Sequence, residues 1–458
     1  MFFKLKKETV KNVLSLALPA VGEMILYMMI WVFDTMMVGQ YGGNVAVSTV
    51  GLSSEIMYTF SGIFISVGIS VAVTSLVARN IGAKKLQNAE EYAALGITAV
   101  TIISFIISSI LFIFSKNILK IAGASTEVTI YGEIYMKITS IGIFFNMITN
   151  VFSAILRGYG NTKTPLLISL VVNVINLSLD YILIFGKSGF PELGIKGAAI
   201  ATTLAQITGF VIFLSYILKK SQIKPKIKYI YNFKVDKFIA LLRLSAPSSL
   251  QEASFSISRL LSTFFIMHLG TIAFAANQIT TTIESISFMP GWGFAVAATT
   301  LVGHKTGEEN PKKAKEYAYT CTILGVGIMT LCSVLFILLP NSLINFFIKS
   351  SETEVIRLGT LCLMVASIEQ PFMAISMILG GSLKGAGDTK TPFKVSFVSS
   401  WFIRLPLILY FIYILKVSVV YVWFITAIQW IFDGTLILVL FTRKFKKFNI
   451  EEKEERLA

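Results

Sequence analysis

The sequence predicts an all-α membrane protein with twelve transmembrane helices in two six-helix lobes. Its composition is 55% hydrophobic and only 14% charged, whereas a soluble domain has about 25% charged residues. Apolar runs of about twenty residues, the length that crosses a bilayer core, recur along the chain. In addition, short segments of the first half reappear in the second. These three observations together predict a duplicated, lipid-embedded chain.

The composition also limits the classes of function. The formal charge of +15 is not accompanied by a polar domain in which basic and aromatic residues alternate, so no nucleic-acid partner is expected. Cys321, Cys332 and Cys362 fall inside apolar runs without metal-ligand spacing, and we expect them to be inert packing residues. Neither a nucleophile arrangement nor a metal pattern is present, so we expect no enzyme and no cofactor.

The boundaries of the twelve spans follow from turn residues and charges between the apolar runs. The first run continues past Asp34 without a small-residue cleavage site, which favours a retained first span over a signal peptide. The expected spans are 13–39, 45–77, 89–115, 127–156, 164–186, 195–218, 238–268, 272–302, 316–340, 353–383, 392–415 and 417–442. Basic residues concentrate in alternate loops, which predicts that both termini are cytoplasmic. The expected location of this multi-pass protein is the plasma (inner) membrane of a prokaryote.

Internal repeats divide the chain. RGYGNTKTP at 157–165 recurs as KGAGDTKTP at 384–392, AEEYA at 89–93 recurs as AKEYA at 314–318, and the segment around Pro19 is echoed around Pro247. The markers keep their order, so we expect two parallel lobes related by a pseudo-twofold axis along the membrane normal. The expected division is 1–218, a cytoplasmic linker 219–237, 238–442 and a cytoplasmic tail 443–458. The repeated turn itself has the glycines and proline of a tight loop before a helix.

A polar stripe interrupts the fifth span. Asn173, Asn176 and Asp180 are spaced by three and four residues, which places them on one face of a helix. Asp34 in the first span lies at a similar depth, and Thr202 in the sixth span could add a hydroxyl group. Two carboxylates, an amide and a hydroxyl suit Na⁺, and a close carboxylate pair also suits a shared proton. Alternatively, Asp34 reaches the membrane surface and Asn176 with Asp180 forms an interhelical hydrogen bond.

The second half lacks this stripe, because Ile403 and Leu407 occupy the positions of Asn176 and Asp180. Residues at matched depths predict structural ion pairs there instead. The expected pairs are Arg404 with Asp433 and Arg259 with Glu284.

Other polar residues suggest a substrate cleft. Glu252 and Glu369 both lie near mid-depth and could form an acidic site for a cationic substrate. Asn173 belongs to the stripe, and Met28 is a flexible side chain that suits a promiscuous pocket. A packing role is the alternative for each.

The chain resembles the multidrug and toxic compound extrusion (MATE) transporters, in particular their DinF-like branch. The resemblance is carried by LALPAVGEMILYMMIWVFDTMMVGQYGG, RGYGNTKTP with NVINLSLDYILIFG behind it, GIKGAAIATTLAQ and KGAGDTKTP. It implies a cation-coupled multidrug antiporter, expected to be monomeric in the membrane, which exchanges Na⁺ or H⁺ for organic, often cationic, compounds by alternating access. The implied coupling-ion residues are Asp34, Asn176, Asp180 and Thr202, and Pro19 is the implied bend of the first span.

The sequence differs from the pattern of the other main branch of the family at one position, and it also leaves one alternative function open. Met373 stands where the other main branch of the family has an acidic residue in span ten, so the resemblance assigns ion coupling to the first lobe. A flippase of lipid-linked substrates is the alternative function, since related folds move such molecules. It would require a strongly cationic cleft.

Overall fold

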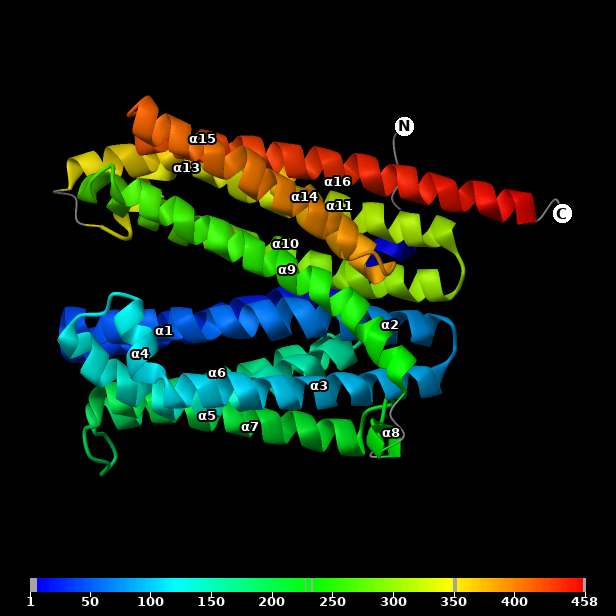
Figure 1. The fold of residues 1–458 in the computed structure, drawn as a ribbon, viewed down its shortest axis with the longest axis horizontal. Helices are drawn as coiled ribbons and strands as arrows, with labels where there is room; N and C mark the ends of the chain where they lie inside the picture. The colour runs from blue at the N-terminus through cyan, green and yellow to red at the C-terminus, as the bar shows by residue number, and fades with distance from the viewer. Residues whose placement is uncertain (1–5, 227, 232–233, 349–351, 456–458) are drawn as a thin grey trace. The chain divides into compact units, whose positions relative to one another are not determined.

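The computed structural model describes residues 6–226, 228–231, 234–348 and 352–455, and every regular element in these residues is helical (Figure 1). Three π-helical segments, Gly62–Ile69, Ser399–Arg404 and Tyr410–Ile414, interrupt the α-helices. The α-helices are α1 Lys7–Ser61, α2 Ser70–Gly82, α3 Leu86–Ile113, α4 Ser115–Ile121, α5 Thr126–Tyr159, α6 Lys163–Phe185, α7 Gly194–Lys219, α8 Lys228–Tyr231, α9 Val235–Met267, α10 Thr271–Gly307, α11 Pro311–Leu338, α12 Pro340–Asn345, α13 Thr353–Gly385, α14 Lys390–Val398, α15 Leu405–Leu409 and α16 Val419–Glu455.

Within the described residues, 10 helical segments are long and apolar enough to cross a membrane. The second predicted span is not among them because it is assembled from the end of α1, a π-helical segment and α2. The seventh is α9, which carries Arg243, Glu252 and Arg259 and is therefore less apolar. The first two spans join across Gly43, whose φ of 59° lies in the left-handed region that glycine enters without steric cost.

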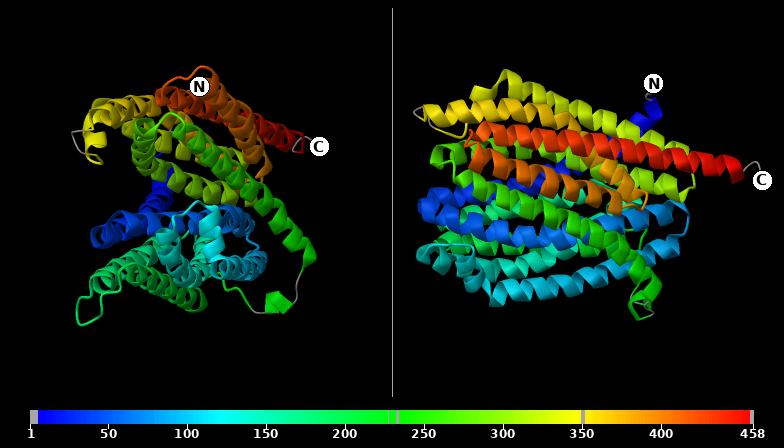
Figure 2. Two further views of the ribbon diagram at one scale, coloured as in Figure 1. Left: turned by 60° about the vertical axis from the view of Figure 1, so that its left-hand side comes forward. Right: turned by 45° about the horizontal axis from the view of Figure 1, so that its top comes forward.

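The chain packs as two compact units. The first unit is Gly22–Ser249, and the second unit combines Met1–Val21 with Leu250–Ala458. The boundaries thus fall inside α1 and α9, whereas the lobes predicted from the repeat meet at the linker. In the first unit α5 packs against α2, α3 and α7, and α6 packs against α7 (Figure 1). In the second unit α13 packs against α10, α11 and α16, the yellow-green to red helices of Figure 2.

The repeated turn has the same backbone conformation in both units. Gly160 (φ 99°) and Gly387 (φ 89°) both adopt a left-handed conformation just after a helix, as is common at helix C-termini. The residues that follow, Asn161 and Asp388, each accept a hydrogen bond from the backbone N–H three residues later, at 3.1 and 3.0 Å. The turn is therefore a local structural device that ends one helix and caps the next.

The first glycine of each copy allows two helices to touch. A Cβ atom at Gly158 would lie 2.9 Å from the carbonyl oxygen of Thr74, and one at Gly385 would lie 2.9 Å from the carbonyl carbon of Thr299. Thr74 and Thr299 are 225 residues apart, so they are repeat partners as well. The duplication therefore preserves a close backbone contact.

Replacing Gly385 with alanine should destabilise the protein by about 1–3 kcal/mol, because the new methyl group overlaps backbone that cannot move independently. Gly327→Ala in α11 is the matched control, since nothing lies within 4 Å of its Cβ position and alanine favours a helix. Thermal unfolding in detergent measures both variants. Equal midpoints for Gly385→Ala and Gly327→Ala would contradict the packing argument.

Acid should weaken the second copy of the turn through Asp388, which lies outside the predicted spans. Burial alone would raise the pKa of Asp388, but hydrogen bonds from Lys444 and from the N–H and hydroxyl of Thr391 bring the pKa below its ordinary value of 3.8. Because the pKa of Asp388 is lower in the folded protein than in the unfolded chain, the ionised carboxylate stabilises the fold at pH values above 3.8. This stabilisation is lost as the pH falls through the pKa of the folded state.

We therefore expect Asp388→Asn to lower the unfolding midpoint near neutral pH, with the difference from wild type shrinking in strong acid. Asp236→Asn, at an exposed carboxylate in the first turn of α9, is the control. A difference that stays constant across the acid range would show that the charge of Asp388 is not responsible.

Candidate ion-binding site

The four residues predicted to bind the coupling ion lie on three helices of the first unit: Asp34 on α1, Asn176 and Asp180 on α6, and Thr202 on α7. All are buried, with exposed fractions of 4%, 1%, 0% and 5%. The helix pairing that positions them depends on Gly197, because a Cβ there would lie 2.5 Å from the carbonyl oxygen of a residue on α6. The small residues that begin α7 therefore let it approach the polar face of α6.

A chain of hydrogen bonds connects these helices. The Asn176 amide donates to the Thr202 hydroxyl (3.3 Å), which donates to Oδ2 of Asp34 (2.9 Å). The carboxyl group of Asp180 lies beside Asp34 and Asn176. Among the described residues, no donor meets hydrogen-bond geometry at Oδ1 of Asp34 or at either oxygen of Asp180.

The cluster is thus rich in acceptors and poor in donors. A buried carboxylate without donors or a counter-charge is strongly destabilising, and two adjacent carboxylates also repel each other. A bound Na⁺ would satisfy the oxygens directly, and a shared proton would convert one acceptor into a donor. The donor set fits either ion, because all its ligand atoms are oxygens of the type that hard cations prefer.

The remaining candidates of the first span and stripe lie outside this chain of hydrogen bonds. Asn173 uses its amide to donate to the Ser169 carbonyl of its own helix at 2.9 Å, and its Oδ1 has no partner. Met28 is half-buried on α1. Pro19 lies within α1 on the part of that helix that belongs to the second unit.

A second carboxyl pair lies in the second unit. Glu369 on α13 is fully buried and neighbours Glu284 on α10. Both carboxylate oxygens of Glu369 lack a donor, and Glu284 can supply one only when it carries a proton. The sequence analysis gave these residues other partners, although both lie near the middle of two spans with the same direction. Matching their depths would have indicated the pair.

Two of the expected neighbours in the second unit differ from the structure. Among the described residues no ion pair within 4 Å joins Arg404 to Asp433; Arg404 instead faces Glu369 and Glu284. Asp433 lies near the Ser399 hydroxyl, which itself donates to the Ser396 carbonyl at 3.1 Å. The physical reason is the π-helical segment Ser399–Arg404, since its wider turns rotate side chains away from the α-helical direction.

The other two expectations for the second unit have mixed outcomes. Arg259 attracts Glu284 electrostatically, in the direction that the depth match predicted. Glu252 lies near Lys384 and Arg259 and accepts a hydrogen bond from Ser256 at 3.5 Å. Glu252 therefore lies beside Lys384 and Arg259, whereas Glu369, with which it was expected to form an acidic site, lies beside Glu284 and Arg404.

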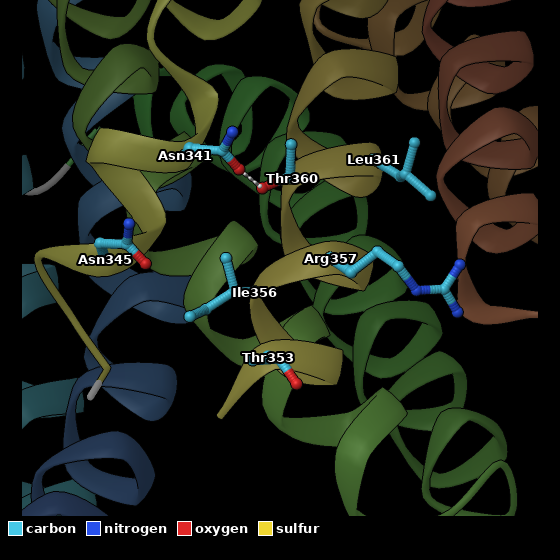
Figure 3. Close-up of a pocket in the computed structure, with 7 residues that line it drawn as sticks. All are labelled: Asn341, Asn345, Thr353, Ile356, Arg357, Thr360 and Leu361. Atoms are coloured by element: carbon cyan, nitrogen blue, oxygen red, sulfur yellow. Dashed lines mark hydrogen bonds between the residues drawn. The ribbon is translucent and has the colours of Figure 1, made fainter. Parts of the chain in front are cut away.

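Outside the two carboxyl pairs, the described residues show no metal-binding group and one pocket away from the site. No group of three or more His, Cys, Asp or Glu side chains in these residues could hold a metal ion. A pocket of about 410 Å³ lies between α12 and the first turns of α13. There Thr360 donates a hydrogen bond to Asn341 at 2.8 Å (Figure 3). The pocket contains none of the predicted site residues, so it is separate from both carboxyl pairs.

Thr202→Val should lower the free energy of unfolding by about 1–3 kcal/mol, because it leaves Oδ2 of Asp34 and the Asn176 amide without a partner. Thr208→Val, on the exposed side of α7 where the hydroxyl bonds to its own helix, is the control. Denaturant or thermal unfolding measures both. A Thr202→Val protein as stable as the control would show that the hydroxyl does not bridge α1 and α6.

Comparisons with known proteins agree with this architecture. The MatE family model matches residues 19–182 and 247–411, once in each half of the chain. The chain is 31% identical over 432 residues to a probable multidrug resistance protein NorM of Thermotoga maritima, covering 94% of this chain and 92% of that protein.

Solved structures match almost the whole chain. An outward-facing multidrug resistance MATE family transporter of the MOP superfamily aligns with a TM-score of 0.89 at 19% identity, covering 97% of this chain and 99% of that one. A MOP superfamily transporter from Pyrococcus furiosus, described as having a binding pocket of reverse polarity, aligns with a TM-score of 0.88 at 19% identity over 97% and 99% of the two chains. These similarities confirm the predicted twelve-helix, two-lobe membrane fold. With the family model matched in both halves, the chain belongs to the MatE family of membrane transporters.

Proposed function

We propose that this transporter is a cation-coupled multidrug antiporter, which exports organic and often cationic compounds in exchange for Na⁺ or H⁺ by alternating access. The observation that carries the proposal is the buried group of carboxylate oxygens on Asp34 and Asp180 without donors. The probable multidrug resistance role of the Thermotoga maritima relative supports the substrate class.

The geometry suggests how an ion acts. Without an ion, two buried carboxylates repel each other, and among the described residues the Thr202 hydroxyl donates to Oδ2 of Asp34 while Oδ1 has no donor. An ion that enters relieves this repulsion and strengthens the connection of α1 to α6 and α7. One charge that moves inward across the membrane supplies about 2.3 kcal/mol per 100 mV. The bound ion would thereby stabilise a conformation of α1, bent at Pro19, that holds substrate less tightly.

The proposal includes the location, the topology and the oligomeric state of the transporter. We infer a multi-pass protein of a prokaryotic plasma membrane with both termini in the cytoplasm, acting as a monomer on small organic molecules. It needs no cofactor besides the transported Na⁺ or H⁺. The two lobes would extend over 1–218 and 238–442, with the linker 219–237 and the tail 443–458 in the cytoplasm.

A flippase of lipid-linked substrates is the second candidate. An anionic head group would need basic side chains to bind it, and in the second unit Arg259, Lys384 and Arg404 lie beside Glu252, Glu284 and Glu369. A lipid-scrambling measurement in liposomes separates the two functions. Ion-independent movement of a labelled lipid-linked sugar would favour the flippase.

The antiporter proposal is tested with purified protein in proteoliposomes, by following ethidium transport under separately imposed Na⁺ and proton gradients. We expect one gradient to drive transport, and both Asp34→Asn and Asp180→Asn to reduce the driven rate by about tenfold or more, a change of about 1.4 kcal/mol. Asn keeps the shape of the side chain but removes the charge that binds the ion.

Glu127→Gln, an exposed carboxylate in the first turn of α5, is the control and should leave transport unchanged. Unchanged ion-driven transport in both aspartate variants would contradict the site. Transport by wild-type protein that neither gradient accelerates would contradict ion coupling itself.

A further inference from the structure

The two compact units exchange helical segments. Residues Met1–Val21 belong to the unit that contains Leu250–Ala458, and the chain up to Ser249 belongs to the unit that begins at Gly22. The crossings follow Pro19 in α1 and Pro247 in α9 by the same two residues. Pro19 and Pro247 are also 228 residues apart, as are Val21 and Ser249. The duplication has therefore placed both crossings at the same position of the repeat.

We define strut 1 as residues 6–21 and strut 2 as residues 234–249, the segments that precede the two crossings. Strut 1 is built into the second unit. Val13 and Ala17 are fully buried in an apolar cluster with Phe294. A Cβ atom at Gly293 would lie 2.7 Å from the backbone nitrogen of Val21. The backbone of strut 1 is therefore in close contact with the backbone of the second unit.

Strut 2 is built into the first unit in the same way. Leu241 and Leu244 are buried in the main apolar cluster of that unit. A Cβ atom at Gly68 would overlap the Ser249 hydroxyl. Gly68 and Gly293 are 225 residues apart and are therefore repeat partners. The same glycine in each unit accommodates the end of the strut that arrives from the other half.

Glutamates at equivalent positions of the repeat bind the N-terminal end of each strut. Glu316 on α11 accepts hydrogen bonds from Lys6 (2.8 Å) and Thr9 (2.6 Å) of strut 1. Glu91 on α3 accepts from Lys234 (3.2 Å) and Lys237 (2.5 Å) of strut 2. Glu91 and Glu316 occupy the same place in the repeated AEEYA and AKEYA segments.

Beyond each crossing the helix is attached to the other unit. Glu23 of α1 accepts hydrogen bonds from Arg157 (3.2 Å) and Ser153 (2.6 Å), all in the first unit. Glu252 of α9 is attracted by Lys384 in the second unit. Arg157 and Lys384 are the first residues of the two repeated turns. Each first helix is therefore fixed to a different unit on either side of its proline.

We propose that struts 1 and 2 stay attached to their host units during transport and that α1 and α9 flex as a matched pair at Pro19–Gly22 and Pro247–Leu250. This proposal rests on the proposed alternating access, because it describes how two units joined in this way can move. Detaching a strut would expose buried apolar side chains such as Val13 and Leu241, which is unfavourable in proportion to the apolar area exposed. Bending at a proline is easier, since the helix there already lacks one backbone hydrogen bond.

The proposal is tested by measuring distances between spin labels on the full chain, with Cys321, Cys332 and Cys362 replaced by alanine. The first pair is Lys11→Cys with Lys313→Cys, which joins strut 1 to its host unit. The second pair is Lys11→Cys with Lys163→Cys, which joins strut 1 to the first unit. All three positions are exposed, and both pairs are measured at acidic and alkaline pH, with and without Na⁺.

We expect the first distance to keep a single unchanged distribution and the second to shift or broaden when the ion conditions change. A change in the first distance shows that the strut leaves its host and overturns the proposal. A second distance that stays fixed under every condition overturns it too, because no flexing then occurs at the crossing. The distances do not depend on which compound is exported, so this result is separate from the ethidium measurement.

A transport measurement tests the same point for both struts. In the same cysteine-free background, the pairs Lys6→Cys with Glu316→Cys and Glu91→Cys with Lys237→Cys are joined by a short thiol-reactive linker, and the joined fraction is measured by mass spectrometry. If the struts stay attached, the joined protein transports ethidium as fast as the same variant before joining. Loss of transport on joining either pair, by about tenfold or more, would show that the strut must detach.

Discussion

The burial of carboxyl groups with too few hydrogen-bond donors is the constraint on which the polar interior of this transporter depends. Asp34 and Asp180 lie among apolar helices, where an ionised group is costly by at least a few kcal/mol unless something neutralises it. The Thr202 hydroxyl donates to Oδ2 of Asp34, and the described residues place no donor in hydrogen-bond geometry at the other buried oxygens of this pair. The stability of the first unit is thereby tied to the occupancy of a small group of oxygens, which is the requirement for an ion to influence helices that it touches.

The two units have the same framework and different chemistry. Contacts that involve backbone, such as those of Gly158 and Gly385 with their threonine partners, are present in both. The charged groups differ, because the second carboxyl pair of Glu284 and Glu369 faces Arg404, whereas the described groups that act on Asp34 and Asp180 are the two carboxyls themselves, Thr202 and Asn176. A fixed positive charge reduces the need for an external cation. The framework therefore allows one unit to bind an ion while the other neutralises its acids internally.

The sequence predicted the helix order and the repeated turn well because both depend on local signals: the length of apolar runs, and glycine and proline at defined places. It indicated which residues of the first unit share a depth, and α1, α6 and α7 bring Asp34, Asn176, Asp180 and Thr202 to one place. It did not predict the neighbours of Arg404. The depth of a residue along a helix does not fix the direction in which its side chain points around the helix axis, and a π-helical segment changes that direction. It also did not reveal the exchanged struts, because a repeat identifies equivalent segments and not their packing partners.

The exchanged first strut has a consequence for biosynthesis. Strut 2 joins a unit whose other helices have already left the ribosome, so the first unit can be completed as α9 emerges. Strut 1 is made first, yet its binding site on α10, α11 and α13 is made a few hundred residues later. At about 5–20 residues per second, the N-terminal segment waits on the order of half a minute without its partners. If the N-terminus is cytoplasmic, as proposed, the basic side chains of this segment would favour its retention at that face until the second unit is made.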